Sequence, residues 1–168
     1  MFNKKKKRIE DAIQNALKDD AQANALAFVA HLRTCDMRIE KFEFHGKDKL
    51  HWEVKYKGEL VCYILINAPD ENFGWTIMPE GSLTSRFADY PLDDAWKEVA
   101  WNNLNICHDG NRCGSCAEGR GKRIKICGKE FDDVCGMAYN FTNPDAMALE
   151  LAKKMMDIRK SDILSKEP

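Results

Sequence analysis

Apolar residues recur at helical spacing along the first part of the chain. A first short helix is predicted from apolar residues that lie three and four positions apart, namely Ile9, Ala12, Ile13, Ala16 and Leu17. Asp19 and Asp20 predict the start of a second helix, because their carboxylates can accept hydrogen bonds from the N–H groups of a first turn. The expected buried stripe of this second helix is Ala21, Ala25, Phe28, Val29 and Leu32. The chain is therefore expected to open with two amphipathic helices.

Beyond these helices the apolar positions alternate with polar ones, which is typical of β-strands. Residues 39–44 predict a first strand, and residues 50–56 predict a second, half-buried one. Residues 60–66 are almost all apolar and predict a central strand that is covered on both faces. Residues 73–77 alternate again, and Pro79 ends that strand. We expect an antiparallel meander of about four strands.

The second half of the chain carries shorter elements. Residues 82–92 are expected to form an irregular link, and Asp93 predicts the cap of a helix that runs through Leu104. Residues 123–127 and 136–141 predict two short strands.

A C-terminal helix is predicted from the sequence Asn143-Pro144-Asp145, with Asn at the cap and Pro in the first turn. After Ser161 this helix is expected to fray. Its expected buried face consists of Met147, Leu151, Met155 and Ile158.

Together these elements predict an α+β fold with N-terminal helices, an antiparallel sheet of about four strands, a Cys-rich loop held by a metal, and a C-terminal helix. A chain of 168 residues fits one domain. The alternative is a subdivision into a helix and sheet part, residues 1–90, and a Cys-rich part, residues 91–168.

Composition and charge narrow the class of protein. Hydrophobic residues make up 44% and charged residues 32% of the chain, as in ordinary soluble domains. A formal net charge of −1 provides no overall field that would attract nucleic acid or a membrane surface. The basic run at residues 4–8 lacks the apolar stretch of a secretion signal, so we interpret it as a solvated helix start. No apolar run approaches the ~18 residues of a spanning helix, and a cytoplasmic location is predicted.

Seven cysteines are the most informative feature of the composition. In a reducing cytoplasm they are not expected to form structural disulfides. Cys35 and Cys62 stand among apolar residues and are expected to be buried small hydrophobes, and His31 is expected to be a packed histidine. The other five cysteines fall within residues 107–135. Such crowding indicates metal binding or redox chemistry.

Four of these five cysteines predict a zinc site. Cys113 and Cys116 form a CxxC turn, which can place both sulfurs on one ion. Zinc takes four such ligands in a tetrahedron at about 2.3 Å from sulfur, so two more cysteines are needed from the flanking segments. The predicted quartet is Cys107, Cys113, Cys116 and Cys135.

Two further side chains are alternates for this site. Cys127 ends an apolar run, where its sulfur can point into the core, and His108 adjoins Cys107. A site with four cysteine ligands leaves no position for water or substrate, so a structural role is predicted. An HExxH pair or a comparable general base is absent from the sequence, which disfavours a zinc hydrolase.

The same residues are compatible with other functions. Cys113 and Cys116 could form a redox dithiol or serve a metal-dependent enzyme, and an iron–sulfur cluster or unrelated thiols are further alternatives. A zinc-ribbon-like contact with nucleic acid is a less favoured alternative, because the net charge does not support it. The basic residues available for that contact are Arg112, Arg120, Lys122 and Arg123.

Large aromatic residues on the predicted strands suggest a ligand pocket. Trp52, Tyr63 and Trp75 could line a cavity for a flat ligand, or they could be core residues. The leading interpretation is a non-enzymatic domain with a structural zinc, which binds a small molecule or a protein partner.

Several short motifs occur together in the second half of the chain. They are the sequence WKEVAWN at 96–102, the cysteines Cys107, Cys113 and Cys116, the sequence GKEF at 128–131, Val134-Cys135, and Phe141 followed by Asn143-Pro144-Asp145. With these motifs the chain resembles a group of uncharacterised small bacterial proteins that have a Cys-rich C-terminal half. The resemblance covers roughly residues 90–160 and implies no activity. It implies that Cys127 is dispensable, because the equivalent position often holds another apolar residue.

Overall fold

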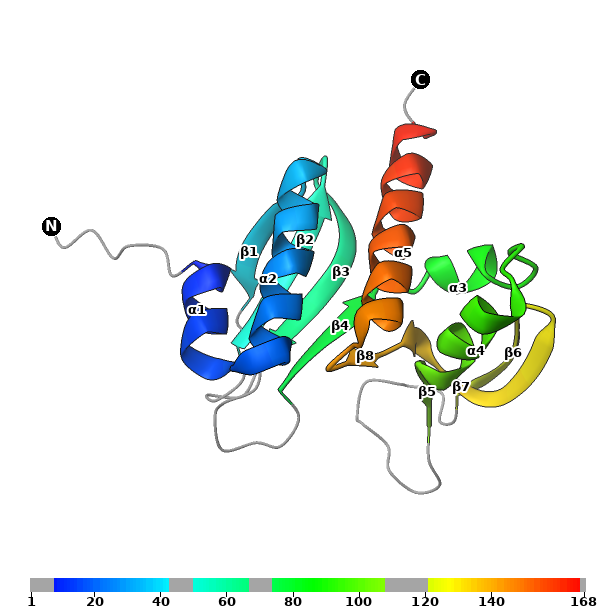
Figure 1. Cartoon of the computed structure of the whole chain (residues 1–168). Helices are drawn as coiled ribbons and strands as arrows, with labels where there is room; N and C mark the ends of the chain where they lie inside the picture. Colours follow the sequence, from blue (N-terminus) through cyan, green and yellow to red (C-terminus); the bar gives the residue numbers. More distant parts are fainter. Residues whose placement is uncertain (1–7, 43–49, 67–73, 108–120, 167–168) are drawn as a thin grey trace, which may run out of the picture.

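Five helices and eight strands are present in residues 8–42, 50–66, 74–107 and 121–166, which are the residues that the computed structural model describes (Figure 1). In chain order they are α1 (Ile9–Ala16), α2 (Asp19–Thr34), β1 (Arg38–Phe42), β2 (Leu50–Tyr56), β3 (Glu59–Ile66), β4 (Trp75–Pro79), α3 (Leu83–Arg86), α4 (Asp94–Asn102), β5 (Leu104–Ile106), β6 (Lys122–Ile126), β7 (Lys129–Tyr139), β8 (Phe141–Thr142) and α5 (Ala146–Leu164). The predicted α+β class is confirmed.

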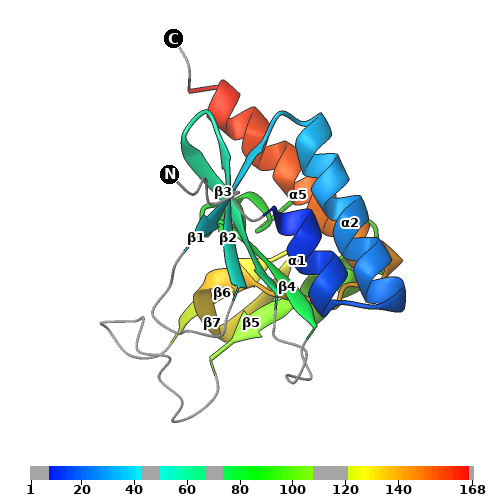
Figure 2. The same ribbon diagram turned by 90° about the vertical axis from the view of Figure 1, so that its left-hand side faces the viewer.

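The larger sheet is antiparallel and has the strand order β1-β2-β3-β4-β8. Helices α1, α2 and α5 lie on one of its faces (Figure 2). Strand β3 is central, as predicted, but its predicted coverage on both faces is wrong. Cys62 and Ile64 are fully buried, whereas Tyr63 and Leu65 on the other face are half-buried. Only every second side chain of this apolar run therefore faces the helices.

The smaller sheet has the order β5-β7-β6, and β6 and β7 form a hairpin. Cys127 and Gly128 make the turn with φ angles of 47° and 84°, a conformation that suits a tight hairpin. The helix predicted to run through Leu104 is shorter, because α4 ends at Asn102 and Leu104 begins β5. The two predicted strands at 123–127 and 136–141 correspond to β6 and to the end of β7 with β8.

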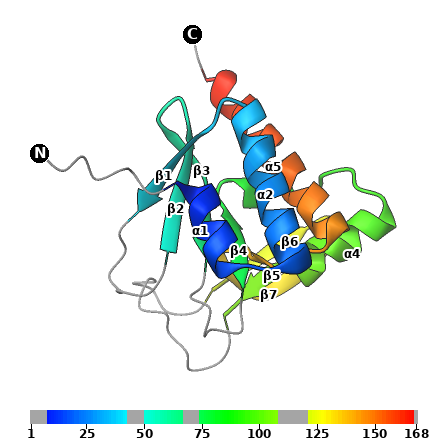
Figure 3. The ribbon, with the colours of Figure 1, turned by 60° about the vertical axis from the view of Figure 1, so that its left-hand side comes forward.

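The C-terminal segment joins the two sheets. β8 continues from β7 and pairs with β4, with Phe141 opposite Ile77. Helix α5 then packs beside α2 and also contacts α4, β3 and β4 (Figure 3). The two parts of the possible subdivision, residues 1–90 and 91–168, therefore both contribute strands to the larger sheet and helices to the layer on its face.

The start of α5 differs from the sequence-based prediction. Asp145, not Asn143, caps the helix by accepting a hydrogen bond from the N–H of Ala148 at 2.8 Å. Asn143 has a φ of 43° and its Oδ1 accepts a hydrogen bond from the N–H of Trp75, so it ties the helix start to β4. Met147 was expected on the buried face but is 42% exposed. The helix also remains regular past Ser161, to Leu164.

A single core lies between the helices and the larger sheet and continues under α4. Its largest fully buried side chains include Trp52, Trp75, Tyr139, Phe28 and Phe141. Leu151, Met155 and Met156 contribute from α5. None of the helices in the described residues is long and apolar enough to cross a membrane.

Candidate functional site

Two cysteines of the predicted quartet lie on adjacent segments of the smaller sheet, Cys107 directly after β5 and Cys135 within β7. In the antiparallel pair β5–β7, Ile106 stands opposite Val134. Cys107 and Cys135 each follow one of these residues, and they therefore share the face of the pair opposite to Ile106 and Val134. They are diagonal neighbours in a ladder whose register shifts before Ile106, and in a regular ladder such positions lie about 7–8 Å apart. Side chains at that spacing can reach one ion between them.

The chain on either side of the CxxC motif returns to the same point of β7. Before the motif, the N–H of Cys107 donates to the carbonyl of Asp133 at 2.7 Å. After it, Lys122 pairs with Val134. A Cβ added to Gly121 would lie 2.4 Å from the backbone of Asp133, so only glycine fits this close approach.

Cys107 and Lys122, described residues on either side of the CxxC motif, therefore both meet β7 within two residues of Cys135. Cys113 and Cys116 stand between them in the sequence, as does the alternate ligand His108, and all three lie outside the described residues. Cys113 is six residues from Cys107, and Cys116 is five residues from Gly121. A chain of that length spans up to about 20 Å, which is ample to bring both sulfurs back to Cys135.

Cys127 occupies a different place. It stands in the β6–β7 turn, is 5% exposed, and its N–H donates to the carbonyl of Phe87. Burial raises the pKa of its thiol. From Lys129 to Cys135 the strand advances by six residues, or about 20 Å. This separation argues against Cys127 as a ligand beside Cys135.

On β6, Arg123 and Lys125 are engaged in ion pairs, whereas Lys122, another basic residue considered for a nucleic-acid contact, has no ion pair among the described residues. Arg123 lies 2.8 Å from Glu130 and 3.5 Å from Asp132. Lys125 lies 2.7 Å from Asp89. These carboxylates offset the positive charge that a nucleic-acid contact would use. Arg112 and Arg120 lie outside the described residues.

The three aromatic residues proposed to line one pocket lie on two faces of the larger sheet. Trp52 stands opposite Ile64 and Trp75 opposite Ile66 on the helix-covered face, where they are 2% and 1% exposed. Tyr63 points to the other face, opposite Glu53. The alternation along adjacent strands separates them, so Trp52, Tyr63 and Trp75 do not form a single pocket.

Trp52 instead borders a cavity at the edge of the sheet. The cavity has a volume of about 520 Å³ and is rich in positive charge. Its polar lining consists of Arg8, Arg33, Arg38, Lys41 and Glu40, and its apolar lining consists of Ile9, Ile39 and Trp52. The indole N–H of Trp52 is buried and has no hydrogen-bond partner among the residues that the structure describes.

Glu10 balances part of the charge around this cavity. Its carboxylate lies 3.5 Å from Arg8 and 3.2 Å from Arg33. Partial burial opposes ionisation of Glu10, but hydrogen bonds from its own backbone N–H, Arg8 and Arg33 hold its pKa below the ordinary value. Arg38 pairs with Glu40 at 2.9 Å. The four cations thus face two carboxylates, and the surplus favours an anion.

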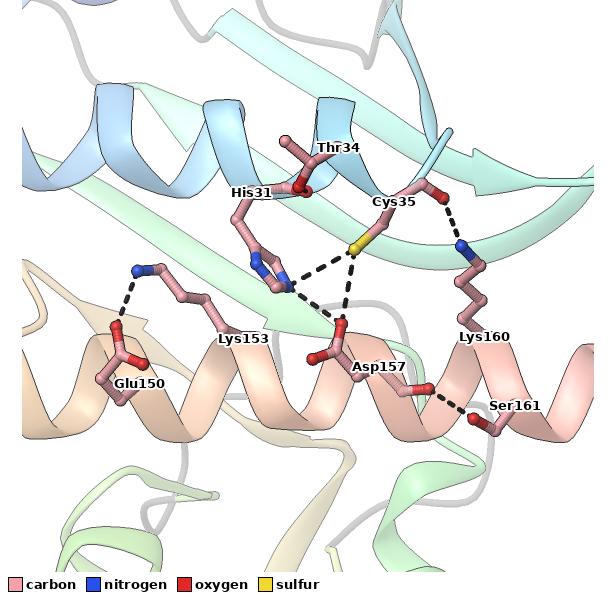
Figure 4. A network of polar contacts seen from close by, with 8 residues as sticks. All are labelled: His31, Thr34, Cys35, Glu150, Lys153, Asp157, Lys160 and Ser161. Atoms are coloured by element: carbon pink, nitrogen blue, oxygen red, sulfur yellow. Dashed lines mark hydrogen bonds and ion pairs between the residues drawn. The ribbon is translucent and has the colours of Figure 1, made fainter.

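A second group of ligand-type side chains joins α2 to α5 (Figure 4). His31 and Cys35 lie one turn apart at the end of α2, and Asp157 faces them from α5. His31 Nε2 is 2.9 Å from Asp157 Oδ1 and 3.7 Å from Cys35 Sγ. The Cys35 thiol donates to Asp157 Oδ1 at 3.5 Å. No other set of three His, Cys, Asp or Glu side chains in the described residues is as close.

This arrangement corrects the expectations for Cys35 and His31. Cys35 is not a buried small hydrophobe but is partly exposed beside two polar groups, whereas Cys62 is fully buried as expected. Partial burial and the Asp157 carboxylate raise the pKa of the Cys35 thiol. The spacing of four residues between His31 and Cys35 indicates that the two side chains share one face of a helix, so the sequence alone could have paired them. Asp157 is 122 residues further along the chain, and nothing in the sequence links it to them.

The group does not have the geometry of a catalytic relay. A Cys-His-Asp relay needs the nucleophile on one ring nitrogen and the carboxylate on the other. Here Nε2 of His31 faces both Cys35 and Asp157. A raised thiol pKa also keeps Cys35 protonated, which is the opposite of an activated nucleophile.

Comparison of the chain with models of known protein families, with curated proteins and with solved structures gave no match.

Proposed function

We propose that this chain is a non-enzymatic binding domain in which a structural zinc holds the smaller sheet together. The zinc ligands are Cys107, Cys113, Cys116 and Cys135. The observation that carries the proposal is the convergence on β7: Cys107 and Cys135 share one face, and both ends of the segment with the CxxC motif meet the strand beside them.

Energetics favour a metal at this point. The segment from residue 108 to 120 is rich in Gly and charged residues, so it offers little apolar surface to offset its loss of conformational entropy. A structural zinc contributes an apparent ~10–16 kcal/mol at neutral pH, which is enough to order such a segment. Four thiolates leave no open coordination position, so the site stabilises the fold and performs no chemistry.

Metal content tests this proposal directly. Protein purified under reducing conditions without chelator is expected to hold zinc at the quartet, and Cys107→Ser or Cys135→Ser is expected to lose it. Cys127→Ala is the matched control, because Cys127 lies in the same small sheet but about 20 Å along it, and it should keep the metal. A wild-type protein without zinc, or the same loss in Cys127→Ala, would contradict the proposal.

Alkylation separates the zinc site from a thiol-redox function at Cys113 and Cys116. Zinc-bound thiolates of a closed site react slowly, whereas a redox dithiol needs an exposed thiol of low pKa. We expect mass spectrometry to find both cysteines protected in the native protein and modified after chelation. Rapid modification of either one in the zinc-loaded protein would favour the redox alternative.

The binding partner supported best by the described residues is a small organic anion at the cavity beside Trp52. Four cationic side chains line it, and Glu40 is the only negatively charged residue among those that line it. Ile9 and Ile39 give the same cavity an apolar wall, which suits an anion with a hydrophobic body.

Phenyl phosphate, which combines an anionic group with an apolar body, is a suitable first probe of the cavity. Titration at low salt, followed by the chemical shifts of the Trp52 indole N–H, is expected to saturate. Lys41→Gln should weaken the affinity about tenfold, the effect of one lost charge-assisted contact. Lys97→Gln on α4 is the control, since Lys97 pairs with Asp94 far from the cavity. Equal affinity in Lys41→Gln and the wild type would contradict the assignment.

A further inference from the structure

The packing of α2 against α5 brings together three side chains that prefer a transition metal. His31 offers an imidazole nitrogen, Cys35 a sulfur and Asp157 a carboxylate oxygen, and each is a common ligand of zinc. The three ligand atoms lie 2.9, 3.5 and 3.7 Å from one another. Figure 4 shows the three side chains pointing toward a common point between the two helices.

These separations fit the edges of a zinc coordination tetrahedron. Bonds of about 2.0 Å to nitrogen or oxygen and 2.3 Å to sulfur place the ligand atoms roughly 3.3–3.6 Å apart. The two edges that involve Cys35 Sγ already match. The edge between His31 and Asp157 is shorter because a hydrogen bond holds it, and it would open by roughly 0.4 Å when an ion replaces that bond.

The surroundings leave room for a fourth ligand. The side chains of His31 and Asp157 are 24% and 53% exposed, so water can reach the group from one side. Lys160 is held away from the sulfur, because its Nζ donates to the carbonyl of Cys35 at 2.8 Å and lies over the ring of Tyr56. Lys153 lies on the same face of α5 as Asp157, one turn before it, and is paired with Glu150 at 2.7 Å (Figure 4).

From this geometry we infer that His31, Cys35 and Asp157 form a second zinc site, distinct from the cysteine quartet, with one coordination position left for water. Binding forms an S–Zn bond at Cys35 and releases its thiol proton to solvent. The ion brings two positive charges, and the thiolate and carboxylate bring two negative ones, so the loaded site is neutral. It connects the end of α2 to the middle of α5.

NMR of the His31 ring tests this inference at the site itself. Zinc is added to the reduced, full-length protein, and the imidazole signals of His31 are followed beyond the first equivalent. They are expected to shift and saturate at one further equivalent and to return when a chelator is added. The rings of His45 and His51, which belong to neither proposed zinc site, serve as internal references.

Substitutions on both helices complete the test. Cys35→Ser and Asp157→Asn should each weaken zinc binding at His31 by about tenfold or more, the effect of losing one of three ligands. Asp162→Asn, on the same helix but paired with Arg86, should leave it unchanged. The absence of any zinc-dependent shift at His31, or an unchanged affinity in Cys35→Ser, would overturn the inference. Because only His31 is observed, either result leaves the quartet untouched.

Discussion

Arg159 shows how one buried charge connects two elements. It is 6% exposed, and its guanidinium donates to the carbonyl of Leu60 at 3.1 Å and to Glu59 at 3.1 Å. Glu80 lies 3.4 Å away. The side chain therefore attaches α5 to the turn side of β3 and to the residue after β4. A helical pattern in the sequence gives an arginine no reason to be buried.

Removal of Arg159 should destabilise the fold. We expect Arg159→Ala to lower the free energy of unfolding by about 2 kcal/mol, because the Leu60 carbonyl loses its partner and Glu80 is left in a partly buried position. Urea unfolding measures this loss. Arg86→Ala, which breaks an exposed pair with Asp162, should cost less than about 1 kcal/mol. An equal loss in both variants would contradict the structural role of Arg159.

The pairing of Glu10 should make stability depend on pH. Its folded-state pKa is lowered from the ordinary 4.5, so the contribution is present above that pH and disappears as pH falls through the folded-state value. At neutral pH, Glu10→Gln should unfold more easily than the wild type by about 0.5–1 kcal/mol. The difference should shrink and then vanish as the pH falls through the folded-state pKa of Glu10. A difference between Glu10→Gln and the wild type that grows toward acid pH would contradict the assignment.

For single residues, the sequence predicts the environment of a side chain only where neighbouring positions in the chain determine it. Cys62 was expected to be buried, and it is, because it alternates with other core residues of β3. Asn143 was expected to cap a helix, but the cap is the following acid, Asp145. Cys35 and His31 were assigned from local hydrophobicity, whereas their surroundings depend on Asp157 in a distant helix.

Elements with a clear period were predictable, and elements set by pairing were not. The amphipathic stripes placed α1 and α2 correctly, and the alternation placed β2 and β4. Strand β5 has only three residues and adjoins a helix end, so its existence depends on pairing with β7. The same is true of β8, whose two residues pair with β4.

β7 passes close to the chain just after β4, and this close approach requires a glycine at position 81. A Cβ on Gly81 would lie 2.7 Å from the carbonyl oxygen of Gly136, whereas a Cβ on Gly136 would meet nothing within 4 Å. We expect Gly81→Ala to cost about 1–3 kcal/mol through this clash. Gly136→Ala is the matched control in the same contact and should change stability by less than about 0.5 kcal/mol. Denaturant unfolding compares the two, and equal losses would contradict the close approach.

At the scale of the whole molecule, the two sheets depend on each other through β7, β8 and α5. The core under α1 and α2 is dominated by large aromatic and aliphatic side chains. The smaller sheet contributes few fully buried residues, among them Val134 and Ile126. The proposed zinc therefore stabilises the part of the molecule that has the smaller core. The sequence indicated this ion from cysteine spacing alone, but it could not indicate that Cys107 and Cys135 would share a face.

Chelation should accordingly loosen the molecule unevenly. After zinc removal under reducing conditions, amide hydrogen exchange is expected to speed up in β5, β6 and the first half of β7. Strands β2 and β3 should stay protected, because their burial does not involve the metal site. Uniform acceleration across both sheets, or none, would contradict a local structural role.

X-ray absorption at the zinc edge tests the central claim most directly. The sample is Cys35→Ser protein loaded with one equivalent of zinc, so that the quartet is observed without the α2–α5 group. We expect four sulfur ligands at about 2.3 Å and no nitrogen or oxygen in the first coordination shell. A shell with two or more light ligands at about 2.0 Å, or failure to retain zinc after dialysis, would contradict a closed site of Cys107, Cys113, Cys116 and Cys135.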